Sequence, residues 1–116
     1  FFFFKQKTAY EIVRDWSSDV CSSDLSWRTP AISRAKALSS ACFERPSGDL
    51  TENAMAPVFR GLMAMEGGHM IPGQGALPVF KNGEIVGAVG GSGGTAQQDE
   101  DASKAGIDAV GLTTAP

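Results

Sequence analysis

The stretch Gly90-Gly91-Ser92-Gly93-Gly94 has residue types that could do chemistry at Ser92. It matches the G-x-S-x-G pattern of a nucleophile elbow, in which the serine lies on a sharp turn between a strand and a helix. Such a serine needs a base to take its proton, and hydrolases with this elbow carry their histidine after the serine. The only histidine of the chain, His69, comes before it. We therefore predict no catalytic residue here and interpret the glycines as steric, because they let a strand turn sharply into a closely packed helix.

The backbone of the same cluster is a candidate ligand site. Its glycines do not fit G-x-G-x-x-G, and no lysine follows them as in a phosphate-binding P-loop. Free N–H groups at the start of a following helix can still receive a carboxylate or a phosphate. We therefore take Ser92, Gly93, Gly94 and Thr95 as candidate cofactor-binding residues, with helix capping as the alternative role.

His69 is the only imidazole of the chain, and a neutral imidazole is a common metal ligand in proteins. It follows Gly67-Gly68, so we expect its backbone to be accessible. The alternative is a surface or hydrogen-bonded histidine. The methionines around it are expected to fill the core, and no separate metal site is predicted.

A helix is predicted to begin at Thr29-Pro30, with Thr29 as the N-cap and proline in the first turn. Its apolar residues recur at three and four positions and should form one buried stripe: Ala31, Ala35, Leu38 and Cys42. A weaker helical pattern follows over 49–60, and Pro57 should interrupt it.

The clearest unit is a hairpin, because Asn82-Gly83 lies between two apolar runs. Its second strand, Ile85–Val89, should be buried on both faces. A last helix is predicted from about Ala96 to Val110, with Thr95 and Gln98 in capping-box spacing. Together these elements predict an α+β fold with a small antiparallel sheet flanked by helices.

The chain has 116 residues, 42% of them hydrophobic, and a formal net charge of -3. This composition is ordinary for a soluble globular domain. It is not basic enough to favour nucleic acid, and no apolar run approaches the ~20 residues that span a bilayer. We expect no nucleic-acid or membrane partner. A cytoplasmic location is favoured, and export stays open.

Residues 1–25 differ from the rest, since they hold four of the seven phenylalanines and no glycine or proline. FFFFKQKTAYEI and CSSDL resemble the conceptual translation of sequencing-adapter read-through. We therefore expect 1–25 to be an artefactual segment outside the fold and 26–116 to be a partial domain whose true N-terminus is missing. The sheet should then show an unpaired edge.

The stretch Gly73–Gly106, GQGALPVFKNGEIVGAVGGSGGTAQQDEDASKAG, resembles the C-terminal signature of the GlcG/HbpS haem-binding (haem-degrading-type) family. That signature joins a G-x-[IV]-[IV]-G-A-[IV]-G strand through S-G-G-T to a helix that contains Q-D-E. The matching residues are Gly83, Val86, Gly87, Ala88, Gly90, Ser92, Gly93, Gly94, Thr95, Gln98, Asp99 and Glu100.

The resemblance implies a profilin-like α/β sandwich, incomplete at its N-terminus, that assembles into homo-oligomers and takes haem as its cofactor. With haem as the implied ligand, His69 is the candidate ligand of the iron, and Ser92, Gly93, Gly94 and Thr95 are candidates to hold the propionates. It implies a haem- or tetrapyrrole-binding module, with slow haem degradation in some relatives, so enzymatic activity stays undecided. Two alternatives remain open. One is an accessory protein or enzyme that takes a small-molecule ligand in glycolate or diol metabolism, and the other is a non-catalytic sensor or scaffold.

Overall fold

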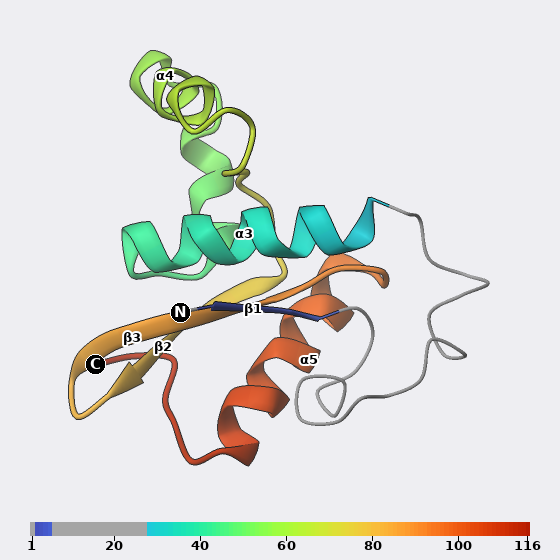
Figure 1. Cartoon of the computed structure of the whole chain (residues 1–116), viewed down its shortest axis with the longest axis vertical. Coiled ribbons are helices and arrows are strands. Elements are labelled where there is room, and N and C mark those ends of the chain that lie inside the picture. Colours follow the sequence, from blue (N-terminus) through green and yellow to red (C-terminus); the bar gives the residue numbers. More distant parts are fainter. Residues whose placement is uncertain (1, 6–27) are drawn as a thin grey trace.

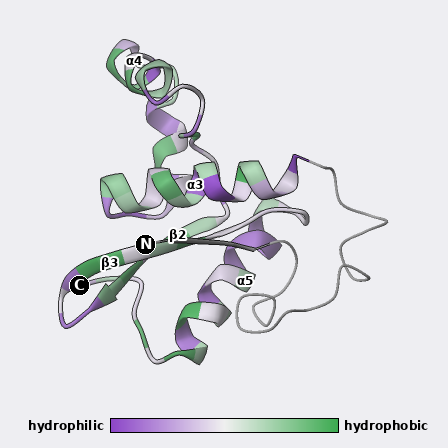
Figure 2. Ribbon diagram, viewed as in Figure 1, coloured by the Kyte–Doolittle hydropathy of each residue, from purple (hydrophilic) through white to green (hydrophobic). Residues whose placement is uncertain are grey.

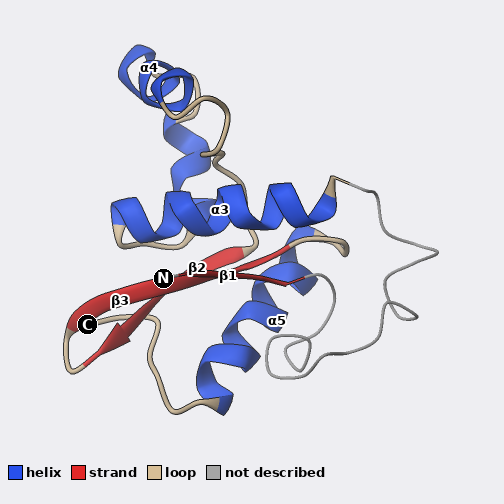
Figure 3. Cartoon of the chain, viewed as in Figure 1, coloured by secondary structure: helices blue, strands red, loops and turns tan. Residues whose placement is uncertain are grey.

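The computed structural model describes residues 2–5 and 28–116 (Figure 1). The elements, in chain order, are β1 (Phe2–Lys5), α3 (Thr29–Phe43), the 3-10 helix η1 (Ser47–Asn53), α4 (Pro57–Met65), β2 (Ala76–Lys81), β3 (Glu84–Gly91) and α5 (Ala96–Ala109). The strands form one sheet in the order β1-β3-β2. Helices α3 and α5 lie on opposite sides of this sheet, and α4 projects away from it (Figures 1 and 3). The predicted α+β class is confirmed.

Strands β2 and β3 form the predicted hairpin. They pair antiparallel, and the turn residues Asn82 and Gly83 have φ angles of 53° and 81°. Positive φ at both central residues gives the turn a backbone twist that matches the right-handed twist of the two strands. The outer strand β2 carries Pro78, which has no N–H to offer to a neighbour. Thr113 forms a bridge to Phe80 on β2, so the C-terminal segment covers part of this edge.

The structure differs from the sequence expectation at β1. Phe2–Lys5 pairs parallel with β3, from Phe2 opposite Ala88 to Lys5 opposite Gly91, so the sheet is mixed and this edge of β3 is paired. The expectation that residues 1–25 are an artefactual segment outside the fold stays a prediction, although Phe2–Lys5 pairs with this edge. The physical reason for the pairing is that an aromatic run favours a strand and an open edge offers it a hydrogen-bonding partner. Residues 6–25 lie outside the described residues.

The core has two different sides around β3. Small residues gather on the side of α3, where the buried cluster consists of Ala37, Ala76 and Ala88. Larger residues gather on the side of α5, where the cluster consists of Leu77, Val79, Val89 and Ile107. Since neighbouring residues of a strand face opposite sides, β3 contributes to both clusters. Of the strand predicted to be buried on both faces, Ile85–Val89, the part from Gly87 to Val89 is buried, whereas Ile85 and Val86 are half-buried.

Gly90 and Gly91 set how closely the two helices approach β3. A methyl group at Gly90 would collide with the backbone carbonyl of Ser33 on α3, and one at Gly91 with the carbonyl of Asp99 on α5. Both obstacles are backbone atoms of helices, which cannot move aside as a flexible side chain can. The contacts at Gly90 and Gly91 therefore support the steric interpretation of the glycine cluster.

The apolar stripe predicted for α3 is only partly buried, because Ala35 is buried and Leu38 half-buried. The sheet-facing positions are Ser33 and Ala37, both with no exposed surface, whereas Ala31 and Cys42 of the stripe are exposed. The N-cap also differs, because α3 begins at Thr29 with Arg28 as its cap and no side-chain cap bond. Close approach to glycine and alanine selects small residues on the inner side of the helix, whatever their polarity.

Pro57 begins α4 instead of interrupting a helix, since a proline in the first turn leaves no hydrogen bond unmade. The helix is fastened by Phe59, whose ring stacks on Phe43 at a centroid distance of 5.4 Å. Val58 and Met65 remain 77% and 83% exposed. The expectation that methionines fill the core is wrong for Met65, because α4 stands clear of the body (Figure 2).

We predict that Gly90→Ala lowers the free energy of unfolding by about 2–3 kcal/mol, because the new methyl group would press on the Ser33 carbonyl. Urea denaturation followed by circular dichroism measures this. Gly61→Ala on α4 is the matched control. Its added methyl group meets no atom within 4 Å, so helix propensity should raise stability by about 0.5–1 kcal/mol. Equal effects of the two substitutions would contradict the close approach at Gly90.

Candidate functional site

Helix α5 begins with the predicted capping box. The Thr95 hydroxyl oxygen accepts the Gln98 backbone N–H at 3.2 Å, and the Gln98 side-chain oxygen accepts the Thr95 N–H at 3.0 Å. Two donors that a helix start leaves without a partner are thereby satisfied within the chain. The structure thus gives Thr95 its capping role.

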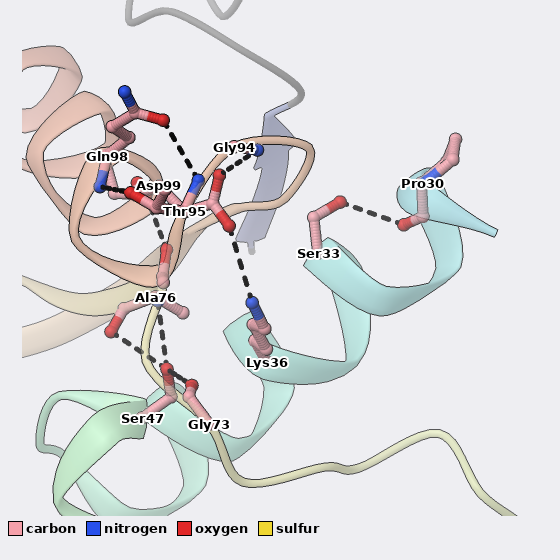
Figure 4. A network of polar contacts seen from close by, with 12 residues as sticks. Pro30, Ser33, Lys36, Ser47, Gly73, Ala76, Gly94, Thr95, Gln98 and Asp99 are labelled. Carbon is pink, nitrogen blue, oxygen red and sulfur yellow. Dashed lines mark hydrogen bonds and ion pairs between the residues drawn. The ribbon is translucent and has the colours of Figure 1, made fainter. Parts of the chain in front are cut away.

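The carboxylate of Asp99 lies against the turn before this helix (Figure 4). Its Oδ1 accepts the Gly94 N–H at 2.9 Å, and its Oδ2 lies 3.8 Å from Nζ of Lys36 on α3. Asp99 is only 5% exposed. The chain therefore supplies its own anion at the place where the sequence suggested a ligand carboxylate, and the same anion draws α3 toward α5.

Buried serines hold the segment between α4 and β2. Ser39 of α3 donates to the Ile71 carbonyl at 2.7 Å, Ser47 of η1 to Gly73 at 2.6 Å, and Ser103 of α5 to Gly75 at 2.8 Å. All three serines have no exposed surface. Because carbonyl groups buried without a partner are costly, these hydroxyls let the segment run through the interior. Residues 71–75 therefore form irregular chain that is held at three of its carbonyls.

His69 lies where this clamped segment leaves α4. Gly67 and Gly68 have φ angles of 62° and 79°, which favour glycine, and the His69 N–H donates to the Glu66 carbonyl at 3.1 Å. Met70, the next residue, is 4% exposed and anchors the segment. His69 is exposed, which agrees with the alternative of a surface histidine.

The imidazole borders a cavity of about 420 Å³ on the outer side of α3. Its described lining residues are Ala31, Arg34, Ala35, Leu38, Gly68 and His69. Most of the wall is apolar, with one guanidinium and one imidazole, and the volume is within the range of about 300–1,000 Å³ that is usual for ligand sites. None of Ser92, Gly93, Gly94 or Thr95 is among these lining residues. The candidate residues from the sequence therefore fall into two places: His69 at the cavity and Ser92–Thr95 at the start of α5.

Cys42 is exposed, so the prediction of a buried cysteine is wrong. Partial burial, together with the negative charge of Glu66, raises the pKa of its thiol. A raised pKa keeps the thiol protonated at neutral pH and makes it a weak nucleophile. Across 2–5 and 28–116, no three His, Cys, Asp or Glu residues gather as a metal site would require, and no helix is long and apolar enough to cross a bilayer.

The sequence of the chain matches the model of a known protein family. Residues 20–108 match the model of the family described as haem-degrading protein HbpS-like. The chain belongs to this family. The earlier resemblance to GlcG/HbpS proteins is thereby confirmed.

Relatives of known sequence or structure agree with this assignment. An uncharacterized 15.0 kDa protein in the dhaT-dhaS intergenic region of Citrobacter freundii is 34% identical over 79 residues, which are 66% of this chain and 55% of that protein. A complex of PduOC with haem matches with a TM-score of 0.63 at 23% identity, over 84% of this chain and 66% of that one, and shows the shared fold. Klebsiella pneumoniae protein ORFY matches with a TM-score of 0.66 at 29% identity, over 74% and 60%. The chain thus spans about half the length of the Citrobacter protein.

Sequence reasoning missed Arg34 and the clamp by Ser39. The spacing of Ala31, Ala35 and Leu38 did carry a signal, because it correctly placed these residues on one side of a helix. What the spacing does not contain is which side the sheet covers.

We predict that Gly68→Val displaces His69, because a β-branched residue at φ 79° is strained by roughly 1–2 kcal/mol. The single histidine gives an unambiguous imidazole proton resonance, so NMR can follow its shift together with thermal stability. Gly68→Asn is the matched control, since asparagine tolerates left-handed backbone and no atom lies within 4 Å of the new Cβ. Identical spectra for both variants and the unmodified protein would show that the turn does not position the imidazole.

Proposed function

We propose that the chain binds haem in the cavity between α3 and His69. Membership of the HbpS-like haem-degrading family supports this, as does the fold shared with PduOC, a protein seen in complex with haem. The observation that carries the proposal is the placement of the only histidine of the chain at the cavity.

The residues at the cavity fit the chemistry of haem. A neutral imidazole from His69 can bind the iron, and the aliphatic walls from Ala31 and Leu38 suit an apolar macrocycle. Arg34 supplies a positive charge suited to a carboxylate. When bound, haem would supply an iron centre, while the chain orients the ring and shields one of its sides from water. Slow haem degradation is a further part of the proposal, and it needs dioxygen and an external reductant in addition to bound haem.

Copies of the chain are proposed to associate with one another, as the family resemblance implies. Helix α4 supports this, because Val58 and Met65 expose apolar side chains on a projecting element. We predict that Val58→Glu with Met65→Glu lowers the mass measured by light scattering, whereas Glu at the exposed Ala105 of α5 leaves it unchanged. A mass equal to one chain before any substitution would reject self-association.

For haem binding, we predict that adding hemin to the protein produces a shifted Soret band with a Kd in the micromolar range or below, and that His69→Ala moves the band and weakens binding about tenfold or more. The loss follows from removing the proposed iron ligand. Absence of any shifted band in the unmodified protein would end the proposal.

The location is tested separately by filling the cavity. Ala31→Phe places a large ring into its wall and should abolish the shifted band. Ala105→Phe adds the same ring on the exposed side of α5 and should leave binding intact. If both variants bind hemin equally, the ligand sits elsewhere on the protein.

A further inference from the structure

The two polar groups of the cavity come from separate parts of the fold. Arg34 belongs to α3, whereas His69 belongs to the clamped segment after α4. Each is fixed by its own contacts: Arg34 by the helix, and His69 by the Gly67-Gly68 turn and by Ser39, which holds Ile71 against α3. A ligand that spans the cavity can therefore contact a guanidinium at one place and an imidazole at another.

The described lining of the cavity holds one arginine and no acidic side chain, although the chain as a whole carries a net charge of -3. Over 28–43 the sequence holds Arg28, Arg34 and Lys36 and no acidic residue. Lys36 is already engaged with Asp99 on the sheet side, so Arg34 is the cation at the cavity itself. Glu66 adjoins the other wall of the cavity, since its backbone carbonyl accepts the His69 N–H at 3.1 Å, but its side chain is not among the lining residues.

A guanidinium is suited to a carboxylate because its planar fork donates two parallel hydrogen bonds to the two oxygens. Arg34 also interacts within the chain. Its five donors allow it to keep such a contact and still bind a ligand carboxylate. An imidazole, in contrast, recognises a metal and has no preference for a carboxylate at the rim.

We propose that the cavity recognises free-acid tetrapyrroles through two separable contacts, with Arg34 on a peripheral carboxylate and His69 on the metal. The inference rests on the proposed function and goes beyond it in one respect. A tetrapyrrole that carries carboxylates but no metal is also a ligand, held by Arg34 and the apolar wall, and an esterified ring is a poor one. Arg34 is then the residue that determines specificity for the acid.

The test compares protoporphyrin, its dimethyl ester, hemin and hemin dimethyl ester, with binding followed by tryptophan quenching and by the Soret band. In the unmodified protein both acids should bind about tenfold to a hundredfold more tightly than their esters, the range expected for a charge-assisted hydrogen bond. Arg34→Gln should remove that difference and leave ester affinity unchanged. His69→Ala should weaken hemin and leave protoporphyrin unchanged.

Two further variants keep the result interpretable. Arg45→Gln removes an exposed arginine outside the cavity and should preserve the preference for acids. Arg34→Lys retains the charge without the planar fork, so it should give an intermediate preference if Arg34→Gln proves unstable in a thermal melt.

The outcomes separate the two proposals. Hemin that binds with the same affinity as its ester, or an Arg34→Gln variant that weakens acids and esters equally, would overturn the two-contact inference and leave haem binding intact. Binding of protoporphyrin without hemin would overturn the metal contact. No binding of hemin in the unmodified protein would end the proposed function itself.

Discussion

Two helices approach the same strand so closely that no side chain fits between them, and the rest of the structure depends on this. Gly90 meets the backbone of α3 and Gly91 the backbone of α5, on opposite faces of β3. Dispersion contacts between close-packed backbones are individually small but numerous, and a methyl group would forfeit many of them. The close approach also brings Lys36 within 3.8 Å of Asp99. The glycine cluster around Ser92 therefore organises packing and capping.

The limited space between these closely packed elements also explains the buried serines. Where α3 and α5 press on the sheet and on the segment before β2, only small residues fit, and a serine fits while also donating a hydrogen bond. Ser39, Ser47 and Ser103 each donate to a carbonyl of that segment. Such bonds contribute about 1 kcal/mol each when made and cost more when left unmade, so the segment has one preferred path. That path fixes where His69 emerges beside α3.

The sequence could predict features that depend on neighbouring residues, but not contacts between segments that are distant in the chain. The hairpin at Asn82-Gly83 and the capping box at Thr95 and Gln98 depend on backbone geometry within a few residues, and both are confirmed. The spacing grouped the stripe of α3 but could not predict which of its residues are buried, because the inner side is determined by contact with Gly90 of a distant strand. The contact between Lys36 and Asp99 was out of reach for the same reason, since it joins two helices that only the sheet brings together.

The distribution of small and large side chains on α3 affects the proposed site directly. A helix usually turns its larger apolar residues toward the core, but here alanine and serine occupy that side, and Leu38 lies with the exposed Ala31 on the other. Apolar surface left in water forgoes about 25 cal/mol for each Å² that burial would remove. An apolar ligand that covers this side recovers that free energy without any rearrangement of the sheet-facing core, because the packing at Gly90 stays untouched. The constraint that makes the inner side of α3 small thus leaves its outer side available for binding.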